Sequence, residues 1–141
     1  MHCPMCKLEM QKQVFEKLEL EYCGDCGGVW LDSGEIEQLG AMTGAMRAGL
    51  LEALDKSLTL EHELSRKRHC PACQRPLVRV RPPQLAPVGL DRCPNFHGLW
   101  FDRGELTQVL ARAGAAKASA LAHFLAGLET QRRAGSQGKK D

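Results

Sequence analysis

The sequence has few aromatic side chains and no long hydrophobic run. Of its 141 residues, 5% are aromatic and 43% are hydrophobic, so its core has few large rings to fill it. No apolar run approaches the roughly 18–20 residues of a membrane-spanning helix, and the first residues lack the apolar segment of a signal peptide. We therefore expect a soluble, cytoplasmic protein, in which cysteines bind metals more often than they form disulfides.

The net charge is small, at +2, but the charged residues are unevenly distributed. Residues 1–46 contain three basic and eight acidic side chains, whereas residues 70–112 contain six basic and three acidic ones. The first part of the chain is therefore expected to be acidic and the second part basic. A basic surface of this kind can contact the phosphates of a nucleic acid.

The chain contains an internal repeat that spans most of its length. The CPMC of residues 3–6 returns as CPAC at 70–73, and the WLDSGE of 30–35 returns as WFDRGE at 100–105. The offset therefore grows from 67 to 70 residues, which places about three extra residues in the second copy, within 81–84. Partial alternation of apolar residues predicts short strands within 14–20 and 77–80.

Each cysteine-rich part continues into a predicted helix with a well-formed start. Asp32 is placed to cap a helix, with Glu35 three positions later as the second half of a capping box. Asp102 and Glu105 repeat this arrangement. Capping explains these carboxylates without paired-carboxylate catalysis, so we predict no catalytic residue and no enzyme activity. Short helices are expected near 33–40 and 103–113, and longer ones near 45–66 and 115–131.

Seven cysteines occur at spacings typical of zinc sites. Two CxxC turns can direct four thiolates to the corners of a tetrahedron around a zinc ion. The predicted ligands of the first site are Cys3, Cys6, Cys23 and Cys26. The predicted ligands of the second site are Cys70, Cys73, Cys93 and His97. His97 completes the second site because Phe96 stands where the fourth cysteine is expected, and His69 is the fallback ligand.

Other interpretations of the cysteines are weaker. Disulfides suit a secreted protein, a thioredoxin-like motif needs one CxxC, and covalent haem needs a histidine directly after the CxxC. Iron remains open for the first site, whereas the histidine of the second site favours zinc. We therefore predict two zinc ions per chain, both structural, because four protein ligands leave no open position for substrate.

These residues resemble a known family, the transcription factor IIB-type zinc ribbons of small bacterial proteins. The family pattern is an N-terminal CPxC followed by a CxxCxGxWLDxGE-like block, and residues 3–6 and 23–35 match it closely. The second copy departs from the pattern at its fourth ligand. The resemblance implies two tandem zinc ribbons and suggests a role in transcription.

The predicted fold class is α+β, with short antiparallel strands in two tandem zinc ribbons that are each followed by helices. The predicted parts are ribbon one with a capped helix (1–44), an amphipathic helix (45–67), ribbon two with a capped helix (68–114), an amphipathic helix (115–131) and a disordered tail (132–141).

Two functions fit this organisation. The first is a regulator or adaptor that binds nucleic acid or the transcription machinery through a basic face formed by Arg75, Arg79, Arg81 and Arg92. The alternative is a protein-interaction adaptor with purely structural zinc, which binds a partner or a second copy through Leu54, Leu58, Phe124 and Leu128. No membrane association is expected in either case.

Overall fold

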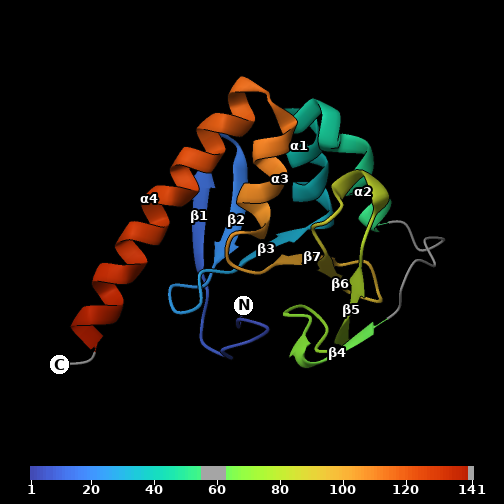
Figure 1. The fold of residues 1–141 in the computed structure, drawn as a ribbon. Coiled ribbons are helices and arrows are strands. Elements are labelled where there is room, and N and C mark those ends of the chain that lie inside the picture. The colour runs from blue at the N-terminus through green and yellow to red at the C-terminus, as the bar shows by residue number, and fades with distance from the viewer. Residues whose placement is uncertain (55–62, 140–141) are drawn as a thin grey trace.

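A single antiparallel sheet joins the two copies of the repeat. The computed structural model describes residues 1–54 and 63–139, and its seven strands lie in the order β1-β2-β3-β7-β6-β5-β4 (Figure 1). The strands are β1 (Gln11–Phe15), β2 (Leu18–Tyr22), β3 (Val29–Asp32), β4 (Glu63–His69), β5 (Pro76–Val80), β6 (Leu90–Arg92) and β7 (Gly98–Phe101). Strands β1–β3 come from the first ribbon and β4–β7 from the second.

The helices lie together on one side of this sheet (Figure 1). They are α1 (Ser33–Thr43), α2 (Arg47–Leu54), α3 (Glu105–Ala113) and α4 (Ala116–Lys139), with short 3₁₀ turns at Gly44–Met46 and Pro83–Leu85. Antiparallel ribbons followed by helices confirm the predicted α+β class. None of the described helices has the length and apolar character that crossing a membrane requires.

The two ribbons meet at the pairing of β3 with β7, which we call the central seam. Its register pairs Val29 with Phe101, Trp30 with Trp100, and Leu31 with Leu99. Each of these residues corresponds to another at the 70-residue offset, so the seam is self-complementary. An approximate two-fold axis therefore passes between Trp30 and Trp100, as in an isologous dimer interface.

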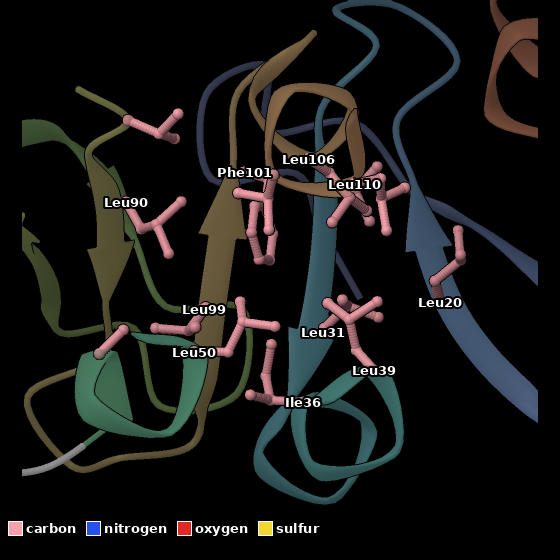
Figure 2. Close-up of a cluster of buried hydrophobic side chains, with 14 of the residues drawn as sticks. Leu20, Leu31, Ile36, Leu39, Leu50, Leu90, Leu99, Phe101, Leu106 and Leu110 are labelled. Atoms are coloured by element: carbon pink, nitrogen blue, oxygen red, sulfur yellow. The ribbon is translucent and has the colours of Figure 1, made fainter. Parts of the chain in front are cut away.

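The two faces of the sheet carry different cores. Leucine and isoleucine side chains from the strands, α1, α2 and α3 fill the helix side, together with Phe101 (Figure 2). The opposite side holds a smaller cluster, in which Trp30 and Trp100 pack with Met10, Leu77 and the buried cysteines. The tryptophans therefore cover the cysteine turns and lie on the face opposite the helices.

Three predicted elements differ from the structure. The 14–20 stretch is a hairpin because Glu16, with φ of 55°, begins a two-residue turn between β1 and β2. Of the predicted 45–67 helix, the described residues contain α2 over Arg47–Leu54, and residues 63–69 pair with β5 as an edge strand instead. The intervening Leu58 lies outside the described residues.

The third difference concerns the predicted disordered tail at 132–141. Helix α4 continues through it to Lys139. Helix propagation from a packed segment adds one hydrogen bond per residue, so a polar composition alone does not end a helix. The extra residues predicted within 81–84 do lie between β5 and β6, where Leu85 is fully buried beside Gly49 of α2.

Candidate metal centres

Each CxxC turn is closed by a hydrogen bond from the residue that follows it. The backbone N–H of Lys7 donates to Cys3 O at 3.0 Å, that of Gln74 to Cys70 O at 2.8 Å, and that of Gly27 to Cys23 O at 2.9 Å. Lys7, Gln74 and Gly27 all have φ between 64° and 79°, in the left-handed region. This tight turn brings the two thiols of each pair onto the same side of the chain.

The first centre contains four thiols whose sulfur atoms all lie within 4.8 Å of one another. They belong to Cys3, Cys6, Cys23 and Cys26. The Cys3 and Cys26 sulfurs are 3.7 Å apart, close to the edge of about 3.8 Å that a tetrahedron with zinc–sulfur bonds of about 2.3 Å has. Backbone N–H groups of Met5 and Cys6 donate to the Cys3 sulfur, which stabilises a thiolate there.

The second centre has the same dimensions with one nitrogen donor. Its ligand atoms, from Cys70, Cys73, Cys93 and His97, again lie within 4.8 Å of one another. His97 Nδ1 is 3.4 Å from the Cys93 sulfur and 3.8 Å from the Cys70 sulfur. The N–H of Ala72 donates to the Cys70 sulfur, and that of Asn95 donates to the Cys93 sulfur. These bonds resemble those of Met5 and Cys6 to the Cys3 sulfur in the first centre.

A shorter turn explains why the histidine stands one residue later than the missing cysteine. In the other three turns the closing N–H comes four residues after the first cysteine, whereas Phe96 N donates to Cys93 O three residues later, at 2.9 Å. Phe96 itself takes the left-handed conformation, with φ of 59°. His97 follows this turn, and its ring points to the fourth corner of the second ligand tetrahedron. His69, the fallback ligand, instead places Nδ1 3.2 Å from Lys7 Nζ.

The donor sets and their burial fit zinc. All seven cysteines are free thiols, and Cys3, Cys23, Cys70 and Cys93 are buried. Burial raises the pKa of the Cys6 thiol and of the Cys70 thiol to about 12, so neither thiol ionises readily unless a cation replaces its proton. Two zinc ions, one with four cysteines and one with three cysteines and a histidine, satisfy these groups.

The first ribbon helps to hold the second centre. Ser33 N donates to His97 O at 3.1 Å, and Ser33 Oγ donates to Phe96 O at 2.5 Å. Ser33 begins α1, so a helix of one ribbon fixes the ligand turn of the other. Sequence analysis missed this contact because the partners are 63 residues apart and no local pattern links them.

A network of ion pairs lies beside the second centre. Arg68 of β4 donates to Asp91 Oδ2 at 3.0 Å and pairs with Asp102 Oδ2 at 3.1 Å. Arg79 of β5 pairs with the same Asp91 oxygen at 3.3 Å and with Glu105 at 2.8 Å. The Asp91 side chain is fully buried, so these two arginines compensate its charge inside the fold.

This network changes the role predicted for Asp102. Asp32 forms the complete capping box with Glu35, as predicted. Glu105 likewise accepts from Asp102 N at 2.8 Å, but the Asp102 side chain accepts from Trp100 Nε1 at 2.9 Å and does not cap α3. Helix α3 begins instead after Gly104, because Arg68 holds the carboxylate of Asp102 away from the helix start.

The predicted partner surfaces are only partly available. Of the four predicted basic residues, Arg79 is in the ion-pair network and Arg92 is 4% exposed, with its guanidinium 5.2 Å from the Phe96 ring centre. Arg75 and Arg81 are exposed. Among the predicted apolar contacts Leu128 is buried, whereas Leu54 and Phe124 are half-buried against the same core.

Comparison with known proteins identifies the two ribbons. The family model described as transcription factor zinc-finger, of the transcription factor IIB ribbon type, matches residues 2–42 and 69–112. Comparisons with curated proteins and with solved structures gave no match. The two matched segments cover more than half of the chain and contain all eight ligand residues. The chain therefore belongs to the transcription factor zinc-finger family, with two tandem copies of its zinc ribbon.

Proposed function

We propose that this chain is a non-enzymatic, zinc-stabilised binding module that docks a protein of the transcription machinery as a regulator or adaptor. The observation that carries the proposal is the ligand count of the two centres, each with four protein donors in tetrahedral reach. Such a site leaves no coordination position for water or substrate, and the free energy of metal binding goes into folding.

The arrangement of the arginines favours a protein partner over a nucleic acid. A phosphate-binding face requires exposed cations, because its affinity comes from neutralising several phosphates. Arg79 already pairs with Asp91 and Glu105, and Arg92 is buried. Only Arg75 and Arg81 of the predicted basic set remain exposed.

Packing also argues against a partner that docks on the leucine faces of the helices. Leu121, Leu125 and Leu128 of α4 are buried in the main core, and Phe124 contacts Phe15 of β1 with ring centres 5.5 Å apart. Polar substitutions there would unfold the protein before they removed a partner. The partner surface is therefore sought on the sheet and not on the helices.

The test compares two classes of partner for the zinc-loaded protein. We expect no micromolar binding to random duplex or single-stranded DNA or RNA near physiological salt by fluorescence anisotropy. We expect measurable binding to purified RNA polymerase from the source organism by biolayer interferometry, with loss of binding after chelation.

The opposite pattern would overturn the proposal. Nucleic-acid binding that weakens steeply with salt and is lost in the Arg75→Glu, Arg81→Glu double variant would assign the chain to nucleic-acid recognition. The exposed Lys117→Glu substitution on α4 is the matched charge-reversal control.

A further inference from the structure

The two metal centres differ at one residue that contacts a half-buried cysteine. In the first centre Cys6 Sγ lies 3.4 Å from Asp25 Oδ2, and in the second centre Cys73 Sγ lies 3.7 Å from Asn95 Nδ2. The two cysteines correspond at the 67-residue offset of the repeat, and Asp25 and Asn95 correspond at its 70-residue offset. The same contact is therefore made by an acid in one ribbon and by an amide in the other.

In the second centre, Cys73 is within reach of solvent. Cys70 and Cys93 are fully buried, whereas Cys73 is half-buried. The neighbouring Asn95 and the fourth ligand, His97, are both exposed. A small neutral molecule can therefore meet the Cys73 sulfur without any opening of the fold.

The surroundings of Cys73 also favour its attack on a peroxide. When a thiolate attacks a peroxide, negative charge moves to the leaving oxygen. The Asn95 amide donates to the Cys73 sulfur and can stabilise that charge, and Arg75, two residues after Cys73, is an exposed cation. Reactive cysteines occupy such partly exposed, electropositive surroundings. At Cys6 the carboxylate of Asp25 opposes the same charge.

Cys93 is placed to form a disulfide with Cys73. The two sulfurs are 3.5 Å apart. Cys73 precedes β5 and Cys93 follows β6, and these two strands pair with each other. Ser33 of the first ribbon also holds the turn after Cys93, through its bonds to Phe96 O and His97 O. Strand pairing and these bonds keep the two sulfurs close even when the centre holds no metal ion.

We propose that Cys73 is an oxidation site at which hydroperoxides oxidise the second centre to a Cys73–Cys93 disulfide. The Cys73 thiolate attacks the terminal oxygen of the peroxide, so that a sulfur–oxygen bond forms and the oxygen–oxygen bond breaks. The leaving alkoxide, or hydroxide from hydrogen peroxide, takes a proton from water. The Cys93 thiolate then attacks the sulfenic acid, which forms the disulfide and releases hydroxide.

The two thiolates lose two electrons in this sequence, and the peroxide gains them. Only Cys70 and His97 then remain as donors in the second centre, so the chain loses one zinc ion and keeps the ion of the first centre. The asymmetry between Asp25 and Asn95 thus makes one of two similar centres responsive to peroxide.

The test treats the full-length, zinc-loaded protein with hydrogen peroxide and follows released zinc with a chromogenic chelator. We expect the release of one ion per chain. Mass spectrometry after alkylation should find Cys73 linked to Cys93, while Cys6 is alkylated as a free thiol. A phosphine reductant and added zinc should restore the second ion, because a disulfide can be reduced and a sulfinic acid cannot. Release of both ions at one rate, or a loss that the reductant does not reverse, would overturn the proposal.

Exchanging the acid and the amide between the ribbons tests the role of charge. Asn95→Asp is expected to slow the peroxide-dependent loss of zinc from the second centre about tenfold, because a carboxylate beside Cys73 opposes the charge on the leaving oxygen. Asp25→Asn is expected to add a peroxide-dependent loss from the first centre. Glu37→Gln on the exposed side of α1 is the matched control and should change neither rate.

Zinc release without peroxide separates thiol reactivity from metal affinity. Each variant should lose zinc to the chelator alone at the rate of the parent protein, because neither exchanged residue is a ligand. Unchanged peroxide rates in both variants, or equal changes with and without peroxide, would overturn the proposal. Binding to RNA polymerase is a separate result: a chain that binds polymerase and resists peroxide keeps the proposed function and loses the oxidation site.

Discussion

Glu35 combines a structural role with a buried charge. Its carboxylate accepts from Asp32 N at 2.9 Å, and burial among other acids raises its pKa from 4.5 to about 7. A carboxyl with a raised pKa binds more protons folded than unfolded, so its contribution to stability falls as pH rises from about 4.5 to about 7. Above about pH 7 the carboxyl is ionised in both states, and the folded protein then bears the full free-energy cost of burying its charge.

Glu35→Gln is expected to remove this cost and keep the hydrogen bond to Asp32 N, because glutamine also serves in a capping box. The variant should match the parent protein near pH 4.5 and exceed its stability by about 1 kcal/mol at pH 8, a figure reduced for partial solvent screening. Urea unfolding across this pH range measures the difference. Glu37→Gln on the exposed side of α1 should show no pH-dependent difference, and a flat Glu35→Gln difference would contradict the prediction.

Local patterns predicted the residues whose roles are local. The CxxC turns and the Asp32 capping box depend on neighbours within four residues, so the sequence alone indicated them. The role of Asp102 depends on Arg68, a residue of β4 that reaches it only through the folded sheet. The same limit applies to Arg79 and Arg92, whose charges suggested a binding face but whose partners are distant in sequence.

At the scale of elements, the central seam depends on two glycines. A Cβ at Gly28 would overlap the Trp100 ring, and a Cβ at Gly98 would overlap the backbone of Leu31 and approach Trp30. Both tryptophans are buried and cannot move aside as a flexible side chain would. The missing side chains therefore allow β3 and β7 to pair under the two indoles.

Gly28→Ala and Gly98→Ala are each expected to destabilise the protein by about 3 kcal/mol, the upper end of the usual cost of overpacking. Chemical unfolding, followed by tryptophan fluorescence, measures this directly. Gly34→Ala is the matched control, because a Cβ there would meet only Asp32 Oδ1 at 3.6 Å. Wild-type stability in both seam variants would mean that the tryptophans do not fix the approach of the two strands.

Elements with their own start and stop patterns were easier to predict than edge strands. The helix over α1 followed from its capping box and apolar spacing. Strand β4 was missed because its sequence, ELSRKRH, lacks apolar alternation, and a polar edge strand exists only when a neighbour offers it hydrogen bonds. The leucine spacing before residue 55 therefore led to a predicted helix that also included residues of β4.

At the scale of the whole molecule, both metal centres stabilise one sheet. Removal of the second zinc should therefore weaken the entire chain and not one half of it. His97→Ala is expected to lower the zinc content from two ions to one per chain and to shift the single thermal transition downward. His69→Ala should keep two ions, since His69 faces Lys7 and not the thiols.

Zinc content by plasma emission spectroscopy and thermal unfolding by circular dichroism check these outcomes. Two separate transitions in the His97→Ala protein would show that the ribbons unfold independently despite the seam. The repeat predicted the two centres. No sequence pattern predicted that β3 would pair with β7, because the strands of each ribbon could also have paired only within that ribbon.

The near-symmetry of the central seam has a consequence for how the chain diversifies. In a dimer of identical chains, every substitution appears on both sides of the axis, so both halves must tolerate it. Here a single chain spans the axis, and each half accumulates its own changes. A histidine stands in place of a cysteine ligand on one side only, and the arginines that pair with buried acids also stand on one side only. The two halves of one chain can therefore differ in the metal ligands and in the ion pairs that each of them carries.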